Sequence, residues 1–579
     1  MTDAAAQVEA AKKALAEAEA ALAAERDASR AEPVVASAAH DAGSIRGPLT
    51  EEQVETIKAG YSFDAPALEM GALVNGDPIA EVPVRIPLAM VNRHGLVAGA
   101  TGTGKTKTLQ VLAEQLSANG VPVFAADIKG DLSGIATPGV SSDKLLERTK
   151  SVGQHWVATA SPTEFFTLGG VGTGIPVRAT VSSFGPLLLS KVLGLNNTQE
   201  SSLGLVFHYA DRAGLPLVGL DDLRAVLQWL VSDEGKPELK NLGGLSGATT
   251  GVILRELIGF SDQGADVFFG EPEIDTSLFL RTTADGRGMV SLLEIPGVQD
   301  RPAVFSTFLM WLLADLFNDL PEVGDIDKPK LVFFFDEAHL LFKDASKDFI
   351  ASITQTVRLI RSKGVGVFFV TQTPKDVPSD VLAQIGSRVQ HQLRAHTPDD
   401  ARALRATVST YPTSGYELGE VLQELAIGEA IITVMNEKGA PSPVAWTRLR
   451  APQGSMSPTA AEAIAATVSA SPLLKTYGTA IDRQSAYEIL SVKMNAAAQA
   501  DASAEAEAAA KQNKADYDRM IRDMRKSEQT SRPKTTTRTT ARRSTRKPDN
   551  PIGDMLGSRT GQTIVREVLR GIFSTLKRK

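Results

Sequence analysis

Eight consecutive residues, Gly99 to Thr106 (GATGTGKT), fit the pattern GxxxxGK[ST] at every fixed position. In this pattern the glycines let the backbone turn its N–H groups inward, where they cradle phosphate oxygens. Lys105 supplies a point charge for the β- and γ-phosphates, and the Thr106 hydroxyl is a ligand for Mg²⁺. The sequence therefore predicts that ATP and Mg²⁺ bind here, with Gly99, Thr101, Gly102, Thr103, Gly104, Lys105 and Thr106 forming the cradle.

A pair of carboxylates, Asp336 and Glu337, ends the apolar run LVFFF. We expect this run to be a strand that neighbours the strand before the phosphate-binding loop, because parallel sheets bind ligands at the carboxyl ends of their strands. Asp336 would then hold the Mg²⁺ shell. Glu337 would orient or deprotonate the attacking water as a general base. The alternative is a solvated acidic turn.

Polar residues end two further apolar strands. Gln372 closes VGVFFVT, where an amide can sense the γ-phosphate or the attacking water; the alternative is an ordinary polar strand end. The run DIKGD, from Asp127 to Asp131, closes VPVFAA and could reach the nucleotide, although a plain turn fits nearly as well. His339 follows the acidic pair and is interpreted as a packing or coupling residue.

Arginines are of interest because phosphoryl transfer is accelerated by a cation on the transition state, supplied by the same chain or by a neighbour. Arg358 and Arg361 lie about one helical turn apart, and we take them as candidates for a finger acting on a neighbouring subunit. Arg388 and Arg394 follow in GSRVQHQLR. A surface salt bridge is an equally good interpretation for any one of them.

The elements that must position these residues alternate between strands and helices. Short apolar strands are predicted at 94–100, 121–128, 331–337 and 365–372, and an alternating strand at 79–88. A helix follows the phosphate-binding loop and closes on Asn119-Gly120, and the first strand, helix and second strand form a βαβ unit. Continuous apolar strands suit a mostly parallel sheet covered on both faces, so we predict an α/β fold with a P-loop core.

The domain organisation follows from changes in composition along the chain. We expect an N-terminal helix with a possible short coiled coil, a linker, a P-loop ATPase domain containing a mainly helical insertion, a helical C-terminal extension, a basic disordered linker and a C-terminal amphipathic helix. The expected ranges, in that order, are 1–30, 31–47, 48–455 with the insertion at 180–320, 456–530, 531–550 and 551–579.

Whole-chain composition excludes several classes of site. The 579 residues include no cysteine, which excludes disulfides, thiolate metal sites and cysteine nucleophiles. No apolar run approaches the 18 residues of a membrane span, and the first residues lack the apolar core of a signal peptide, so we expect a cytoplasmic protein. The net charge is −7, yet the segment 532–547 (RPKTTTRTTARRSTRK) is basic and contains no acid.

Several segments together resemble the bacterial HerA-like ATPases of the YjgR type, in the HerA/FtsK branch of RecA-like P-loop proteins. They are NRHGLVAGATGTGKT, PVFAADIKGDLSG, KPKLVFFFDEAHLLF, VRLIRSKGVGVFFVTQTPKDVP and VLAQIGSRVQHQLRAHTPDD, and the resemblance covers roughly 60–495. It implies an ATPase of RecA-like fold whose relatives form hexameric rings that pump or open double-stranded DNA. Lys105, Thr106, Asp336, Glu337 and Gln372 match the ATPase motifs of that branch. HerA itself carries a sizeable N-terminal β-barrel, whereas only about 45 residues stand here between the linker and the P-loop.

Two functions are consistent with these observations. The first is a hexameric DNA translocase or helicase, with the basic segment binding DNA through sequence-independent contacts. The second is an ATP-driven machine or switch that acts on a protein or an envelope-assembly partner without DNA. A small-molecule kinase is a weaker third alternative, since the arrangement of the carboxylates and Gln372 is that of an ATPase.

Overall fold

The computed structural model describes residues 47–239, 243–294, 302–324, 326–342 and 347–529. The chain forms two compact units, Met1–Ala497 and Ala498–Lys579. The predicted N-terminal helix, nearly all of the first linker, the basic linker and the C-terminal amphipathic helix lie outside the described residues. The predicted domain boundaries stay predictions.

A single large sheet organises the first unit. In the described part of the chain it has twelve strands in the order β2-β1-β12-β11-β10-β3-β9-β8-β4-β7-β5-β6. The strands from β10 to β6 run parallel, and those from β2 to β11 pair antiparallel. The strands are β1 (Ala67–Asn75), β2 (Asp77–Pro87), β3 (Gly95–Ala98), β4 (Val123–Asp127), β5 (Thr163–Leu168), β6 (Ile175–Val177), β7 (Val290–Glu294), β8 (Leu331–Phe335), β9 (Val365–Thr371), β10 (Ser387–Gln390), β11 (Glu429–Val434) and β12 (Ala445–Leu449).

The central parallel strands are buried along their whole length. Every residue of β3, β4, β8 and β9 is buried, as expected for strands covered on both faces. The rings of Phe334 and Phe368 pack between β8 and β9 with their centroids 5.3 Å apart, and those of Phe335 and Phe369 pack 6.0 Å apart. The predicted α/β fold with a mostly parallel sheet is confirmed.

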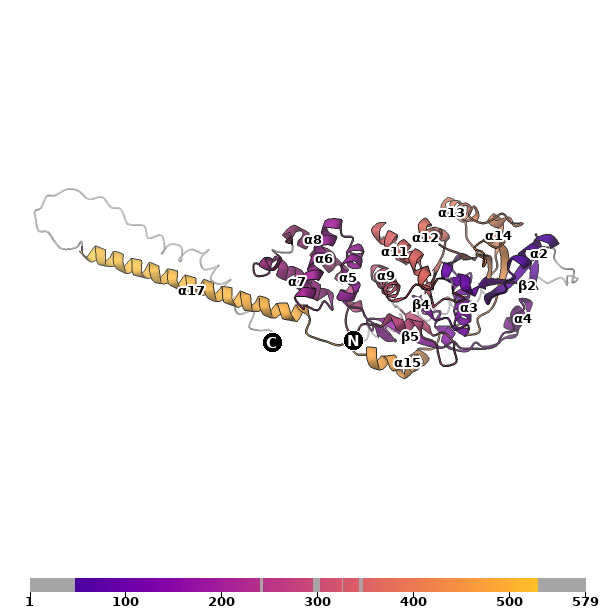
Figure 1. Cartoon of the computed structure of the whole chain (residues 1–579), viewed down its shortest axis with the longest axis horizontal. Helices are drawn as coiled ribbons and strands as arrows, with labels where there is room; N and C mark the ends of the chain where they lie inside the picture. Colours follow the sequence, from indigo (N-terminus) through magenta and orange to yellow (C-terminus); the bar gives the residue numbers. More distant parts are fainter. Residues whose placement is uncertain (1–46, 240–242, 295–301, 325, 343–346, 530–579) are drawn as a thin grey trace, which may run out of the picture. The chain divides into compact units, whose positions relative to one another are not determined.

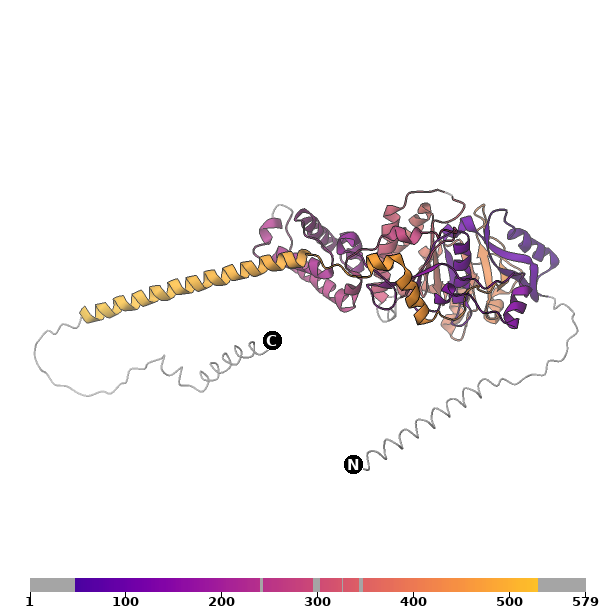
Figure 2. The same cartoon turned by 90° about the horizontal axis from the view of Figure 1, so that it is seen from below.

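Helices cover both faces of this sheet because its crossovers run in two directions. The connection from β3 to β4 moves along the sheet one way, whereas the connections from β7 to β8 and from β8 to β9 move back. Since such crossovers are right-handed, helices of opposite direction lie on opposite faces. Accordingly, α3 (Lys105–Ala118) and α15 (Ala461–Ala470) lie in front of the sheet in Figure 2, which is the view from below. On the opposite face, α9 (Pro302–Asp319) and α11 (Lys347–Ile360) lie above the sheet in Figure 1.

The range 180–320 contains a helical lobe but is not helical throughout. Its first four helices gather together in Figure 1: α5 (Val181–Val192), α6 (Asn197–Arg212), α7 (Leu220–Val231) and α8 (Gly247–Asp262). The strand β7 follows them and lies between β4 and β5 in the sheet. The core of the P-loop fold therefore resumes inside the range that the sequence indicated as mainly helical.

The remaining helices lie before the phosphate-binding loop, between the strands, and at the C-terminal end of the described chain. They are α2 (Glu51–Gly60), α4 (Asp143–Ser151), α10 (His339–Phe342), α12 (Ser379–Leu382), α13 (Pro398–Val408), α14 (Leu418–Glu424), α16 (Pro472–Tyr477) and α17 (Ala486–Gln529). Among the described residues, no helix combines the length and apolar character needed to cross a membrane.

Candidate nucleotide-binding site

The phosphate-binding loop connects β3 to α3 at the carboxyl edge of the sheet. Gly102 and Gly104 have φ values of 83° and 108°, a left-handed region that favours glycine. Lys105 folds back over the loop, and its Nζ donates to Gly99 O at 2.6 Å and to Ala100 O at 3.1 Å. The ammonium thus lies against the loop backbone, next to the N-terminus of α3, where phosphate oxygens are favoured.

The order of the strands differs from the prediction in one respect. The strand that carries Asp336 is not adjacent to β3, because β9 pairs with both β3 and β8 and lies between them. At a strand spacing of about 4.8 Å, β3 and β8 are roughly 10 Å apart. Gln372, at the end of β9, therefore stands between the phosphate-binding loop and the acidic pair.

The acidic pair is buried at the end of β8. Asp336 is 9% exposed, and burial, followed by the charge of Glu337, raises the pKa of its carboxyl from 3.8 to about 7. Glu337 is 6% exposed and its N–H donates to Asp336 Oδ1 at 2.9 Å. Its φ of 48° is in the left-handed region, which is uncommon for a residue with a side chain. Such a conformation is held only where the surrounding structure determines it.

A loop from Asp127 to Leu132, here called the coupling loop, joins the two halves of the site. The Asp127 carboxylate accepts from the N–H groups of Gly130 at 2.8 Å and Leu132 at 2.9 Å, which fixes the shape of the loop. Asp131 Oδ2 accepts from the Thr106 hydroxyl at 3.0 Å. Lys129 Nζ contacts Glu337 Oε1. Residues of the coupling loop that the sequence left open as a plain turn therefore contact both a predicted metal ligand and the predicted base.

The electrostatic environment of Lys105 also connects these groups. Burial lowers the pKa of Lys105, and the carboxylates of Glu337 and Asp336 oppose that shift. Lys105 of the phosphate-binding loop thus lies within the field of both carboxylates at the end of β8. The phosphate-binding loop and the acidic end of β8, which are distant in sequence, thus lie close to each other at this edge of the sheet.

The carboxylates around Thr106 fit a divalent cation. Asp127, Asp131 and Asp336 each offer an oxygen, and the three oxygens lie within 4.8 Å of one another. Asp131 Oδ1 is buried without a hydrogen-bond partner, so one ligand atom has nothing else to bind. Oxygen donors of this kind suit Mg²⁺, which is bound through one or two carboxylates together with substrate phosphates.

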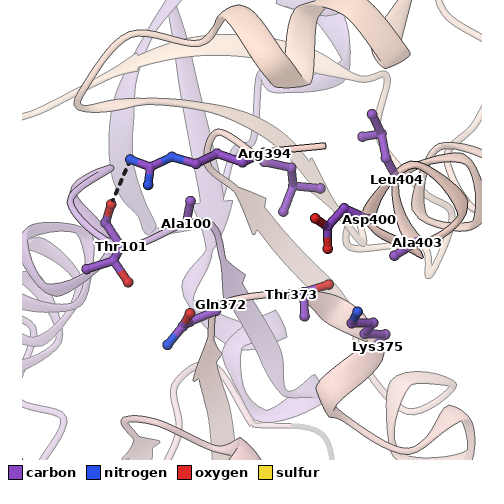
Figure 3. A pocket seen from close by; sticks show the side chains of 10 residues that line it. Ala100, Thr101, Gln372, Thr373, Lys375, Arg394, Asp400, Ala403 and Leu404 are labelled. Atoms are coloured by element: carbon purple, nitrogen blue, oxygen red, sulfur yellow. Dashed lines mark hydrogen bonds between the residues drawn. The ribbon is translucent and has the colours of Figure 1, made fainter. Parts of the chain in front are cut away.

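A polar cavity of about 250 Å³ adjoins the phosphate-binding loop (Figure 3). Gln372, at the end of β9, and Arg394, which follows β10, line opposite sides of it together with Ala100 and Thr101 of the loop. One guanidinium nitrogen of Arg394 donates to Thr101 O at 3.4 Å. This places a cation and an amide beside the phosphate-binding loop of the same chain.

The two candidate finger arginines lie elsewhere. Arg358 is exposed near the end of α11, and Arg361 begins the short turn Arg361–Lys363 immediately before β9. The strand then runs about 20 Å to reach Gln372, at 3.3 Å per residue. Neither arginine is therefore at the phosphate-binding edge of its own chain, and action on a neighbouring subunit stays a prediction.

Two histidines near the ends of β3 are fully buried, His94 immediately before the strand and His391 beside the phosphate-binding loop, and neither was identified from the sequence. His391 Nε2 lies 2.9 Å from the Thr108 hydroxyl on α3, and a Cβ added at Gly99 would approach His391 Cβ to 2.4 Å. His94 Nδ1 accepts from the Val367 N–H at 3.1 Å, at the start of β3. Burial lowers the pKa of each imidazole from 6.5 to about 4, so both are neutral at pH 7.

Comparison with known proteins agrees with this arrangement. Residues 73–579 match the family model described as Helicase HerA-like C-terminal. The DNA double-strand break repair helicase HerA of Saccharolobus solfataricus is 23% identical over 388 residues, which cover 66% of this chain and 69% of the relative. HerA of Sulfolobus acidocaldarius is 21% identical over 393 residues, with the same coverage.

Solved structures with a similar fold include two proteins of lower identity. The bacterial conjugative coupling protein TrwBΔN70 is 15% identical with a TM-score of 0.48, covering 71% of this chain and 94% of that one. VirB4 of Thermoanaerobacter pseudethanolicus is 16% identical with a TM-score of 0.43, covering 68% of this chain and 98% of that one.

Proposed function

Because this chain belongs to the Helicase HerA-like C-terminal family and is a P-loop ATPase, we propose that it is a ring-forming motor that uses ATP to translocate along DNA. The observation that carries the ATPase chemistry is the contact between the two halves of the site. Thr106 of the phosphate-binding loop bonds to Asp131, and the coupling loop in turn reaches Glu337 through Lys129. Its cofactor is Mg²⁺ and its substrate is ATP.

The residues of the candidate site have separate roles in this mechanism. The loop backbone and Lys105 would bind the triphosphate, while Thr106 and Asp336 would hold the metal, with Asp131 as a further oxygen donor. Bound Mg²⁺ would neutralise charge that develops on the phosphates. Glu337 accepts a hydrogen bond from the attacking water and takes its proton. Gln372 senses the γ-phosphate from the neighbouring strand and links its loss to movement of the loop after β9.

Ring formation is supported by where the arginines lie. The structure places Arg358 and Arg361 away from the phosphate-binding edge of their own chain, so a finger role requires a second subunit. The archaeal relatives named as HerA helicases support DNA as the substrate. We expect a hexamer in the presence of a non-hydrolysable ATP analogue, measured by light scattering at micromolar protein. A strict monomer under those conditions would contradict the motor.

The test of DNA as the substrate is ATP turnover with double-stranded DNA, single-stranded DNA and RNA at a fixed salt concentration. We expect stimulation by double-stranded DNA that decreases steeply as salt rises, because phosphate contacts release counter-ions. A variant whose lysines and arginines in 532–547 are replaced by glutamine should lose the stimulation. The matched control carries the same sixteen residues in shuffled order and should keep it, since the contacts are sequence-independent. Stimulation by a protein partner with none by DNA would favour the alternative machine.

A further inference from the structure

The coupling loop contains one cation, Lys129, among the carboxylates of the site. Its ammonium contacts Glu337 Oε1, and the charges of Glu337, Asp336 and Asp131 all raise its pKa against the opposing effect of burial. The side chain of Lys129 is 42% exposed, whereas that of Glu337 is 8% exposed. The lysine therefore reaches from the surface into the buried acidic cluster and supplies its counter-charge.

This contact has a direct consequence for the base. A general base must offer a lone pair to water within hydrogen-bond distance, and its efficiency depends on its affinity for a proton. The ammonium of Lys129 occupies Oε1 of Glu337, so this oxygen cannot accept a hydrogen bond from water while the pair persists. The backbone of Glu337 is itself in the left-handed region. Paired in this way, Glu337 is a restrained base.

Entry of a divalent cation changes the balance of charge. The three oxygens that fit the metal belong to Asp127, Asp131 and Asp336. Two of these carboxylates, Asp131 and Asp336, also interact electrostatically with Lys129. A bound metal is the largest local charge in such a site, and it would both satisfy these carboxylates and repel the ammonium. The tip of the coupling loop has room to respond, because a Cβ added at Gly130 would meet no atom within 4 Å.

We propose that Lys129 is an exchangeable counter-ion that restrains Glu337 until metal-bound ATP enters, when the incoming cation displaces the ammonium and frees the carboxylate for water. Lys129 is thus a positioning residue that acts through Glu337. Glu337 would therefore be free to activate water only when the site holds metal-bound ATP. This inference rests on the proposed ATPase mechanism and adds to it the control of its base.

A thermal double-mutant cycle on the full chain tests the exchange without relying on activity. The melting temperature is measured for the parent, Lys129→Met, Glu337→Gln and the double variant, first in EDTA and then with Mg²⁺ and a non-hydrolysable ATP analogue. In EDTA we expect Lys129→Met to lower the melting temperature more in the parent than in the Glu337→Gln background, by about 1–2 °C. With the metal-bound analogue this difference should vanish. A difference of the same size in both conditions would overturn the exchange.

Steady-state kinetics supply the second readout. Because the loaded site no longer holds the pair, Lys129→Met should leave kcat for ATP at the parent value and lower the KM for Mg²⁺-ATP severalfold, whereas Lys129→Arg, which keeps the charge, should keep the parent KM. Lys144→Ala, an exposed lysine on α4, is the matched control and should leave both constants unchanged. If Lys129→Met does not fold, Lys129→Gln replaces it, because the amide keeps a donor without the charge. A KM equal to that of the parent in a folded Lys129→Met would contradict the exchange.

The base role of Glu337 and the exchange of Lys129 can be refuted separately. If Glu337→Gln hydrolyses ATP at the parent rate, the proposed base assignment is wrong. If Glu337→Gln is inactive but the thermal coupling persists with the metal-bound analogue, the ATPase mechanism stands and only the exchange of Lys129 fails.

Discussion

The buried carboxyl of Asp336 should destabilise the folded protein when it is ionised. Its carboxyl is 9% exposed and its pKa is raised from 3.8 to about 7, with burial as the main cause. Since one pKa unit corresponds to about 1.36 kcal/mol, ionising this group costs the folded state about 4 kcal/mol at pH 8 relative to the unfolded chain. We therefore predict that Asp336→Asn stabilises the metal-free, nucleotide-free protein while it abolishes Mg²⁺-dependent turnover.

The sign of the pH dependence follows from the raised pKa. Between pH 3.8 and about 7 the folded state holds a proton that the unfolded state has lost, so stability relative to the neutral variant falls as pH rises through this window. The advantage of Asp336→Asn should therefore be about 4 kcal/mol at pH 8 but only about 2 kcal/mol at pH 5.5. The amide can still accept the Glu337 N–H bond that Asp336 Oδ1 accepts at 2.9 Å.

The assay is urea denaturation of both proteins in EDTA at pH 8 and pH 5.5, with Asp77→Asn, an exposed position on β2, as the control for a change of one charge. The control should shift the free energy of unfolding by no more than about 0.5 kcal/mol. A destabilised Asp336→Asn, or an effect that is equal at the two pH values, would refute the reasoning.

Three further predictions concern Lys105, Gln372 and the two buried histidines. Lys105→Ala should abolish measurable binding of a fluorescent ATP analogue, because the loop loses its only charge for the β- and γ-phosphates; unchanged affinity would contradict that role. Gln372→Ala should bind ATP with the parent affinity and lower kcat at least tenfold, whereas an equal kcat would reduce Gln372 to an ordinary strand end. Acidification from pH 7 to 4.5 should destabilise the fold by about 2 kcal/mol for each of His94 and His391, since their lowered pKa values mean that the unfolded state takes up protons first. Urea midpoints at the two pH values measure this loss, which should be smaller in a His94→Gln variant.

The local chemistry of the site could be predicted because each part is encoded within a few residues. The phosphate-binding loop is a contiguous motif between an apolar strand and a helix, and β8 and β9 are continuous apolar runs with polar ends. The order of these strands could not be predicted, because the insertion of β9 between β3 and β8 depends on pairings between distant segments. The strand β7 could not be predicted either, because VSLLE is a run of only five residues that follows a series of helices.

The contacts of Lys129 could not be predicted from the sequence, for a different reason. Lys129 and Glu337 are separated by 208 positions, and a lysine in a glycine-containing turn is usually a solvated surface residue. Only the three-dimensional arrangement brings it into the acidic cluster. The same holds for His391, whose isolated position in GSRVQHQLR gives no sign of its bond to Thr108.

The central claim is that Glu337 acts as the base for ATP bound at the loop that begins at Gly99. The most direct measurement compares Glu337→Gln with the parent in two assays on the same sample, equilibrium binding of Mg²⁺-ATP and single-turnover hydrolysis. We expect unchanged affinity and a rate of hydrolysis reduced by at least about 100-fold, the contribution typical of a general base. Hydrolysis at the parent rate by the Glu337→Gln variant would contradict it.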